Sequence, residues 1–278
     1  MSRLYCTADE FTNWPTGLDL QNLIPNGSAQ EQAAQLRVVL ESASSYVDQI
    51  VYQPLRATQS TEYASARPDP YGRLEVRVKR FPVTSVALVP ALLSAQWRQT
   101  TRSGWLAVPA ANITLVGNLL HQYLIDDRDY SVYGGWGLPP LTVQTTYVGG
   151  YPNPALTANA AAGATTIQVD DVTGLQDGTA LTIYDIAGGQ EDVLVQSVSG
   201  STVTLASGLS YAHVVGVRAS ALPAAVTMAT INIAAWIIKG RRAGGGIVMN
   251  GQLQPMQVGE SEDMQQAMKL LAPFIRRV

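Results

Sequence analysis

The sequence predicts an α+β fold in which a helical core with accompanying strands is interrupted by a small all-β domain of barrel or sandwich type. Helical periodicity occurs toward the two ends of the 278-residue chain, before residue 53 and after residue 222. Residues 157–221 instead hold short runs of β-branched residues separated by glycines, with no Lys, Pro or Trp. We therefore predict a host domain of residues 1–156 and 222–278, which ends in a tail, and an inserted β domain at 157–221.

The host domain begins with two helices, each announced by a capping box. Thr7 and Glu10 have the spacing of this motif, which predicts a short helix that stops before Pro15. Ser28 and Glu31 repeat it and open an amphipathic helix over residues 29–52. The apolar stripe of this helix recurs at three- and four-residue steps and consists of Leu36, Leu40, Ala43, Val47 and Ile50.

Strands follow in both domains. Residues 72–79 alternate apolar and charged side chains, as expected of a strand with one buried face. Further host strands are predicted at 113–116, 130–132 and 141–148, with a charged turn at 126–129. The inserted domain is predicted to contain five short strands, at residues 164–170, 180–184, 192–198, 202–205 and 214–219.

Two helices complete the host domain. Pro223 suits the first position of a helix, which we expect to run to about Lys239 and to stop at Gly240. Its apolar run is slightly short for a bilayer span and carries Thr and Asn, so we expect a buried helix outside any membrane. An extended segment at 247–259 then leads to a last helix at 261–271, whose stripe is Met264, Ala267, Met268 and Leu271.

Composition narrows the classes of function. Charged residues make up 14% of the chain and the net charge is −3, which disfavours a strongly basic nucleic-acid surface and favours a surface covered in an assembly. The single Cys6 allows no intrachain disulfide, and His121 and His213 lack the spacing of a metal site. The first residues lack the apolar core of a signal peptide.

Motifs of enzymes are missing from the sequence, so we expect neither catalytic residues nor a cofactor or metal. There is no nucleophile elbow, P-loop or zinc-protease motif. The acidic pairs Asp170–Asp171 and Glu191–Asp192 are expected to be solvated, with calcium binding as the alternative. His213 is expected to serve packing or the surface. The most suggestive segment is the end of the chain, where Phe274 and Ile275 stand beside two arginines, a composition typical of docking on a partner.

Five short motifs carry a family resemblance through their order in the chain. They are LESASSYVD at residues 40–48, FPVTSV at 81–86, TTYVGGYP at 145–152, LPAAV at 222–226 and LAPFIRR at 271–277. This order resembles the head–tail connector proteins of long-tailed bacteriophages, also called adaptor or head-completion proteins. The match covers most of residues 28–152 and 222–278, whereas the segment 157–221 resembles a β module of phage virion proteins.

The resemblance implies a structural virion protein without enzymatic activity and with a helical-bundle connector core. Such a protein forms a homo-oligomeric ring, usually a dodecamer in that family, beneath the portal in the phage neck. It joins the head to a stopper, tail-completion or tail-terminator protein, and double-stranded DNA passes through its lumen without sequence-specific binding. The implied location is the head–tail interface of the virion, and the host cytoplasm during assembly, with no membrane partner.

Carried over to this chain, the family pattern assigns two sets of residues. The portal-docking tail would comprise Leu271, Phe274, Ile275, Arg276 and Arg277. Ring and bundle contacts would come from the two long helices through Leu36, Leu40, Val47, Ile231 and Trp236. The competing hypothesis is a non-enzymatic protein whose β module binds carbohydrate or another surface, with stacking faces from Trp97, Trp105, Trp136 and Tyr151.

Overall fold

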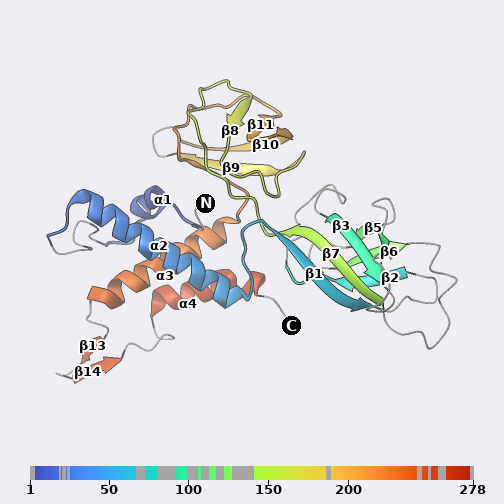
Figure 1. Cartoon of the computed structure of the whole chain (residues 1–278). Coiled ribbons are helices and arrows are strands. Elements are labelled where there is room, and N and C mark those ends of the chain that lie inside the picture. The colour runs from blue at the N-terminus through green and yellow to red at the C-terminus, as the bar shows by residue number, and fades with distance from the viewer. Residues whose placement is uncertain are drawn as a thin grey trace. The chain divides into compact units, whose positions relative to one another are not determined.

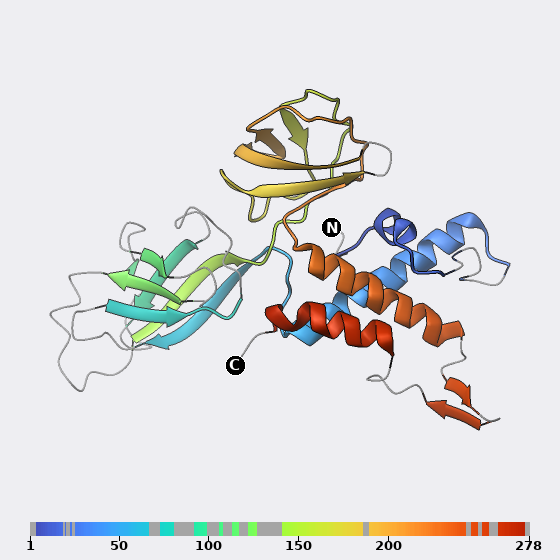
Figure 2. The same cartoon turned by 180° about the vertical axis from the view of Figure 1, so that it is seen from behind.

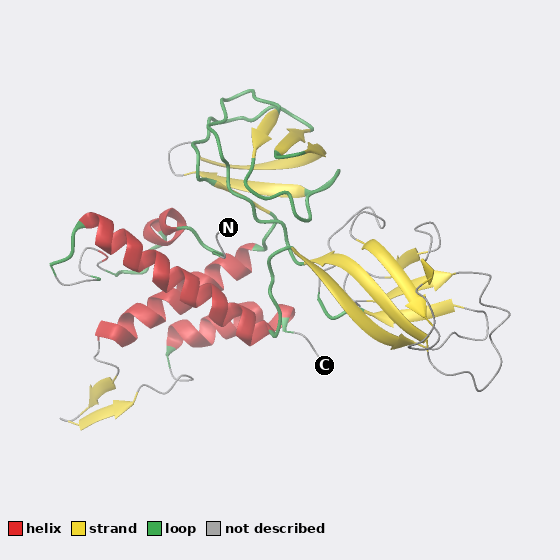
Figure 3. Cartoon of the chain, viewed as in Figure 1, coloured by secondary structure: helices red, strands yellow, loops and turns green. Residues whose placement is uncertain are grey.

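A computed structural model shows a mixed α+β protein with two compact units, Met1–Pro54 with Leu222–Val278 and Leu55–Ala221. All its described helices belong to the first, here the helical unit, and β1 to β12 belong to the second, the β unit (Figure 1, Figure 3). The predicted boundary at residue 157 stays a prediction. The described residues are 4–18, 20, 23, 26–66, 73–80, 92–98, 106–107, 113–116, 122–126, 141–185, 189–242, 246–249, 252–255 and 261–275.

The helical unit joins segments from far apart in the sequence. It contains α1 (Ala8–Asn13), α2 (Ala29–Val51), α3 (Ala224–Arg242) and α4 (Glu262–Leu271), followed by a 3-10 turn at Ala272–Phe274. Helix α3 packs against both α2 and α4 (Figure 2). Both predicted capping boxes are confirmed, because the side chains of Thr7 and Ser28 accept hydrogen bonds from the amides of Glu10 and Glu31.

Two details of these helices differ from the sequence-based expectation. Gly240 lies inside α3 and does not end it, since one glycine in a helix costs only about 1 kcal/mol and Ile238 beside it is buried. Met268 is 43% exposed on α4, whereas the other members of the predicted stripe are buried. Between α3 and α4 the chain forms a two-stranded ribbon of β13 (Gly246–Met249) and β14 (Gln252–Pro255).

A short segment before α1 is tied to both long helices through Tyr5. The side chain of Tyr5 is buried, and its hydroxyl donates a short hydrogen bond to Asp48 of α2. Its amide donates to the Ser44 hydroxyl at 3.0 Å, and its carbonyl accepts from Thr227 of α3 at 3.2 Å. Polar contacts therefore fasten this segment across α2 and α3.

The first part of the β unit contains two antiparallel sheets. One has the order β1-β7-β3-β4, from β1 (Thr58–Ala66), β7 (Leu141–Gly149), β3 (Leu92–Arg98) and β4 (Leu106–Ala107). The other has the order β2-β6-β5, from β2 (Arg73–Arg77), β6 (Gln122–Asp126) and β5 (Ile113–Val116). The predicted strands at 72–79, 113–116 and 141–148 are confirmed as β2, β5 and β7, while the one at 130–132 lies outside the described residues.

The second part of the β unit is a curled five-stranded sheet over residues 155–221, here called the barrel. Its order is β12-β9-β10-β11-β8, from β8 (Thr166–Gln168), β9 (Ala180–Asp185), β10 (Gly189–Ser199), β11 (Thr202–Leu205) and β12 (Arg218–Ser220). The leading segment bridges the two edges of the sheet, because Ala155 pairs with Arg218 and Leu156 with Val169. Closure leaves few unpaired strand edges, and the interior is a cluster of buried aliphatic side chains.

A tight crossing precedes the barrel at Gly150. Tyr151 donates its amide to the Leu55 carbonyl at 2.7 Å, and the Tyr151 carbonyl accepts from Ala57 at 2.8 Å. Gly150 has φ +103, and a Cβ there would lie 2.3 Å from the Arg56 carbonyl oxygen. The Arg56 side chain forms a 2.7 Å ion pair with Asp171, which follows β8.

Among the described helices, none has the length and apolar character needed to cross a bilayer.

Candidate functional site

The predicted docking tail begins in the core of the helical unit. Leu271 is fully buried on the inner face of α4. Phe274 and Ile275, at the end of the following turn, are half-buried. Arg276 and Arg277 lie outside the described residues. Apart from the exposed Met268, the apolar side chains at this end that a partner could contact therefore start at Phe274, one turn beyond α4.

The predicted contact residues of the long helices lie where α2 and α3 pack within one chain. Leu36, Leu40 and Val47 of α2 are buried, as is Ile231 of α3. Trp236 is half-buried, and its ring centroid lies 5.9 Å from that of Tyr46 on α2. These residues account for the packing of the helical unit, and their predicted part in contacts between copies stays a prediction.

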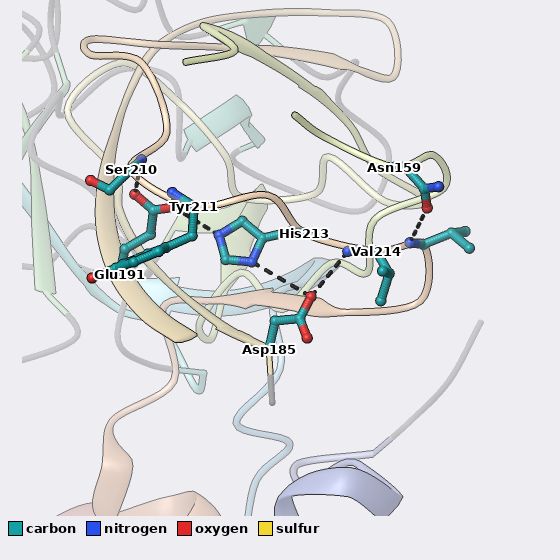
Figure 4. Close-up of polar contacts among 8 residues, drawn as sticks. Asn159, Asp185, Glu191, Ser210, Tyr211, His213 and Val214 are labelled. Atoms are coloured by element: carbon teal, nitrogen blue, oxygen red, sulfur yellow. Dashed lines mark hydrogen bonds and ion pairs between the residues drawn. The ribbon is translucent and has the colours of Figure 1, made fainter. Parts of the chain in front are cut away.

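A densely connected polar cluster lies in the barrel around His213 (Figure 4). His213 is 1% exposed and sits in the loop between β11 and β12. Its Nε2 lies 2.8 Å from Glu191 Oε1 and its Nδ1 lies 3.7 Å from Asp185 Oδ2. Because an ionised carboxylate only accepts, we assign the ring proton to Nε2. Thus β9 and β10 place one carboxylate on each side of a buried imidazole.

Glu191 holds the loop through three acceptor contacts. Besides the His213 ring, its carboxylate accepts from the amides of Ser210 at 2.7 Å and Tyr211 at 3.1 Å. Burial alone raises the pKa of Glu191, but the hydrogen bonds from Ser210, His213 and Tyr211 together outweigh it. The pKa of this carboxyl therefore lies below its ordinary value of 4.5 in the folded chain.

The other side of the loop is held by Asp185 and Asn159. Asp185 Oδ2 accepts from the amide of Val214 at 3.0 Å, and the Asn159 side chain accepts from that of Val215 at 2.8 Å (Figure 4). Backbone pairing adds to this, because Ala160 and His213 exchange two hydrogen bonds of 2.8 Å. The loop is thereby fixed from β9, from β10 and from the leading segment of the barrel.

This geometry identifies the cluster as a fastening of the loop and corrects the expectation that Glu191 is solvated. Both ring nitrogens of His213 face carboxylates, and no hydroxyl or thiol of the described residues bonds to the ring. The expected packing role of His213 agrees with its burial. The period of β10 offered a signal, since Glu191 alternates in step with the apolar Val193 and Val195 and thus faces inward.

Of the remaining candidate residues, some have contacts within the chain and others have side chains outside the described part. Asp171 is also not solvated, because its carboxylate pairs with Arg56 and both side chains are little exposed. Burial alone raises the pKa of Asp171. The hydrogen bonds from Thr173 and from the Arg56 guanidinium outweigh this effect, so the pKa lies below its ordinary value. Tyr151 is half-buried. The side chains of Trp97, Trp105 and Trp136 lie outside the described part of the chain.

Comparison with known protein families finds no family that matches the chain, and comparison with curated proteins gives no match.

Proposed function

We propose that this protein is a head–tail connector of a long-tailed bacteriophage, a non-enzymatic virion protein that forms a ring beneath the portal. The ring, a dodecamer on the family pattern, extends the DNA channel toward a stopper or tail-terminator protein. The helical unit corresponds in this proposal to a helical-bundle connector core. The main support for this proposal is the order of the five sequence motifs, which comes from the sequence alone.

The observation that carries the docking part of the proposal is the end of α4. Met264, Ala267 and Leu271 are buried in the unit, whereas Met268 of the same helix is 43% exposed. Phe274 and Ile275 follow immediately, half-buried, and two arginines come next in the sequence. An apolar pair beside two guanidinium groups is the composition of an interface anchor. Its affinity for a portal ring would be multiplied because each copy contributes one tail.

The action of such a protein is geometric. Each contact around a ring joins two different surfaces of neighbouring copies and has to close on itself. The low charged fraction of 14% suits a surface that is largely covered by neighbours, and the net charge of −3 suits a lumen through which DNA slides. The proposed location is the head–tail interface of the virion.

The decisive test removes the tail without disturbing α4. The full chain and a chain truncated after Pro273 are mixed with portal proteins of long-tailed phages, and the masses of the complexes are measured by native mass spectrometry. Val38→Ala serves as the control, because Val38 is an exposed apolar residue on α2. We expect the full chain and the control to join portal in a defined multimer, and the truncated chain to remain free.

Two other outcomes would count against the proposal. If the full chain ignores every portal offered, including that of its own phage, the connector function is wrong and a surface-binding β module becomes the better account. If the truncated chain binds as well as the full chain, the tail is not the docking element.

A further inference from the structure

The loop of residues 210–215 lies on one seam of the barrel. Ala160 of the leading segment and His213 of the loop pair through two hydrogen bonds of 2.8 Å, and further backbone bonds lie on either side, from Gly163 to Leu209 at 2.7 Å and from Gly216 to Leu156 at 2.8 Å. The same loop presents three exposed apolar side chains, Tyr211, Val214 and Val215, which are 48%, 49% and 57% exposed. Because these side chains are exposed, their burial contributes little to fixing the loop. Its hydrogen bonds therefore hold it in place.

Besides the backbone pairing with Ala160 and the bond from Val215 to Asn159, the contacts of the loop converge on two carboxylates. Glu191 accepts three hydrogen bonds from the loop, and Asp185 accepts one and faces the second ring nitrogen of His213 (Figure 4). Hydrogen bonds to an ionised carboxylate are about twice as strong as neutral ones. The closed seam thus depends in part on the ionised state of these carboxylates.

We propose that Glu191, His213 and Asp185 form an acid-sensitive clasp, which keeps the 160–213 seam of the barrel closed at neutral pH and releases it in acid. The inference concerns the barrel alone and holds whether or not the chain is a phage connector.

The direction of the pH dependence follows from Glu191. Its pKa is lowered in the folded chain, so its stabilising contribution is complete above the ordinary value of 4.5 and is lost as the pH falls through the lower folded value. On protonation one carboxyl oxygen becomes a donor that faces amide donors, and the contacts with Ser210 and Tyr211 are weakened.

The charged and titratable surroundings of Glu191 come from each neighbouring element. The loop supplies His213 and Tyr211, and β9 supplies Asp185. On β10 the next residue, Asp192, bonds to Thr182 instead. On β12, Arg218 lies opposite Tyr184 of β9. Of these groups, Glu191 is the one that bonds to the loop backbone at two successive amides, which makes it the titrating element of the clasp.

The test measures hydrogen exchange of the full chain, resolved by NMR or by peptide mass spectrometry, from pH 6 to about pH 2.5. Protection factors relative to intrinsic rates are followed for the amides of Ser210, Tyr211 and His213. The amides of the β9–β10 pairs, such as those of Leu181 and Val193, serve as an internal reference. We expect the loop amides to lose about tenfold in protection in acid while the reference amides keep theirs.

Two variants sharpen the result. Glu191→Gln keeps the shape of the side chain but replaces one acceptor oxygen by a donor, so its loop should already be less protected at pH 6 and should change little in acid. Asp177→Asn removes an exposed carboxylate of the same barrel and should behave as the unsubstituted chain.

The proposal is overturned if the loop amides of the unsubstituted chain keep their protection at the lowest pH. It is equally overturned if loop and reference amides lose protection together, since that is global acid unfolding. These outcomes depend only on the unsubstituted chain, so the test stands even if Glu191→Gln fails to fold.

Discussion

Substitution of Gly150 by alanine tests whether the crossing before the barrel is as tight as its geometry indicates. A Cβ at Gly150 would lie 2.3 Å and 2.5 Å from the carbonyl oxygen and carbon of Arg56 and 2.8 Å from the amide nitrogen of Ala57. All three are backbone atoms, so relief requires the segment of residues 55–57 to move. That movement breaks the two hydrogen bonds that this segment exchanges with Tyr151.

The expected loss is the sum of two contributions. A non-glycine residue at φ +103 costs about 1 kcal/mol or more in backbone strain. Each lost backbone hydrogen bond costs about 1 kcal/mol, which brings the total for Gly150→Ala to about 3 kcal/mol. Gly178→Ala is the matched control, because Gly178 lies in the same unit at φ +80 with no atom within 4 Å of an added Cβ. Its loss should be only the strain, about 1 kcal/mol.

Scanning calorimetry separates these values. A difference of about 2 kcal/mol between the two variants corresponds to about 4–8 °C in Tm for a unit of this size. Replacing glycine by alanine also lowers the conformational entropy of the unfolded chain, but this effect is the same in both variants and does not contribute to the difference. If the two variants melt together, the segment of residues 55–57 yields at little cost and the argument from the crossing is wrong.

Three further changes have defined outcomes. Leu271→Ala should lower the free energy of unfolding by about 2–5 kcal/mol and Met268→Ala by less than about 0.5 kcal/mol in denaturant titrations, because only the first is buried; equal losses would contradict the burial. Tyr5→Phe should lower it by about 1 kcal/mol through loss of the hydroxyl's hydrogen bond to α2, and an unchanged midpoint would show that this bond contributes nothing. Asp171→Asn should destabilise the chain at neutral pH by about 2 kcal/mol, since Arg56 loses this ion pair. The pKa of Asp171 is lowered, so this difference should shrink as the pH falls below the ordinary value of 3.8, and a difference that is independent of pH would refute the pairing.

The helices could be predicted because their signals are local. Thr7 with Glu10 and Ser28 with Glu31 are three residues apart, and each pair fixes the start of a helix regardless of the rest of the chain. The ribbon between α3 and α4 also had a local signal, since Asn-Gly at residues 250–251 is typical of a hairpin. From the sequence we expected only an extended segment at residues 247–259 and no hairpin.

The strands that escaped prediction depend on distant partners. β1 reads TQSTEYASA, with almost no apolar alternation, and becomes a strand because all nine residues pair with β7. The His213 cluster has the same origin, since Glu191 is 22 residues away in sequence and meets the ring only through the sheet. The sequence shows which of these groups can carry charge, but not which of them face one another across the sheet.

The assembly of the helical unit from both ends of the chain bears on how the protein is made. The ribosome completes α2 and then the whole of residues 55–221 before α3 and α4 exist. Until then α1 is the only described helix available to pack on α2, whose apolar stripe includes Leu40 and Val47. The β unit can fold first as a domain during synthesis, at a pace set by its non-local pairings. The nascent chain thus carries a partly uncovered apolar helix for the time needed to translate the β unit.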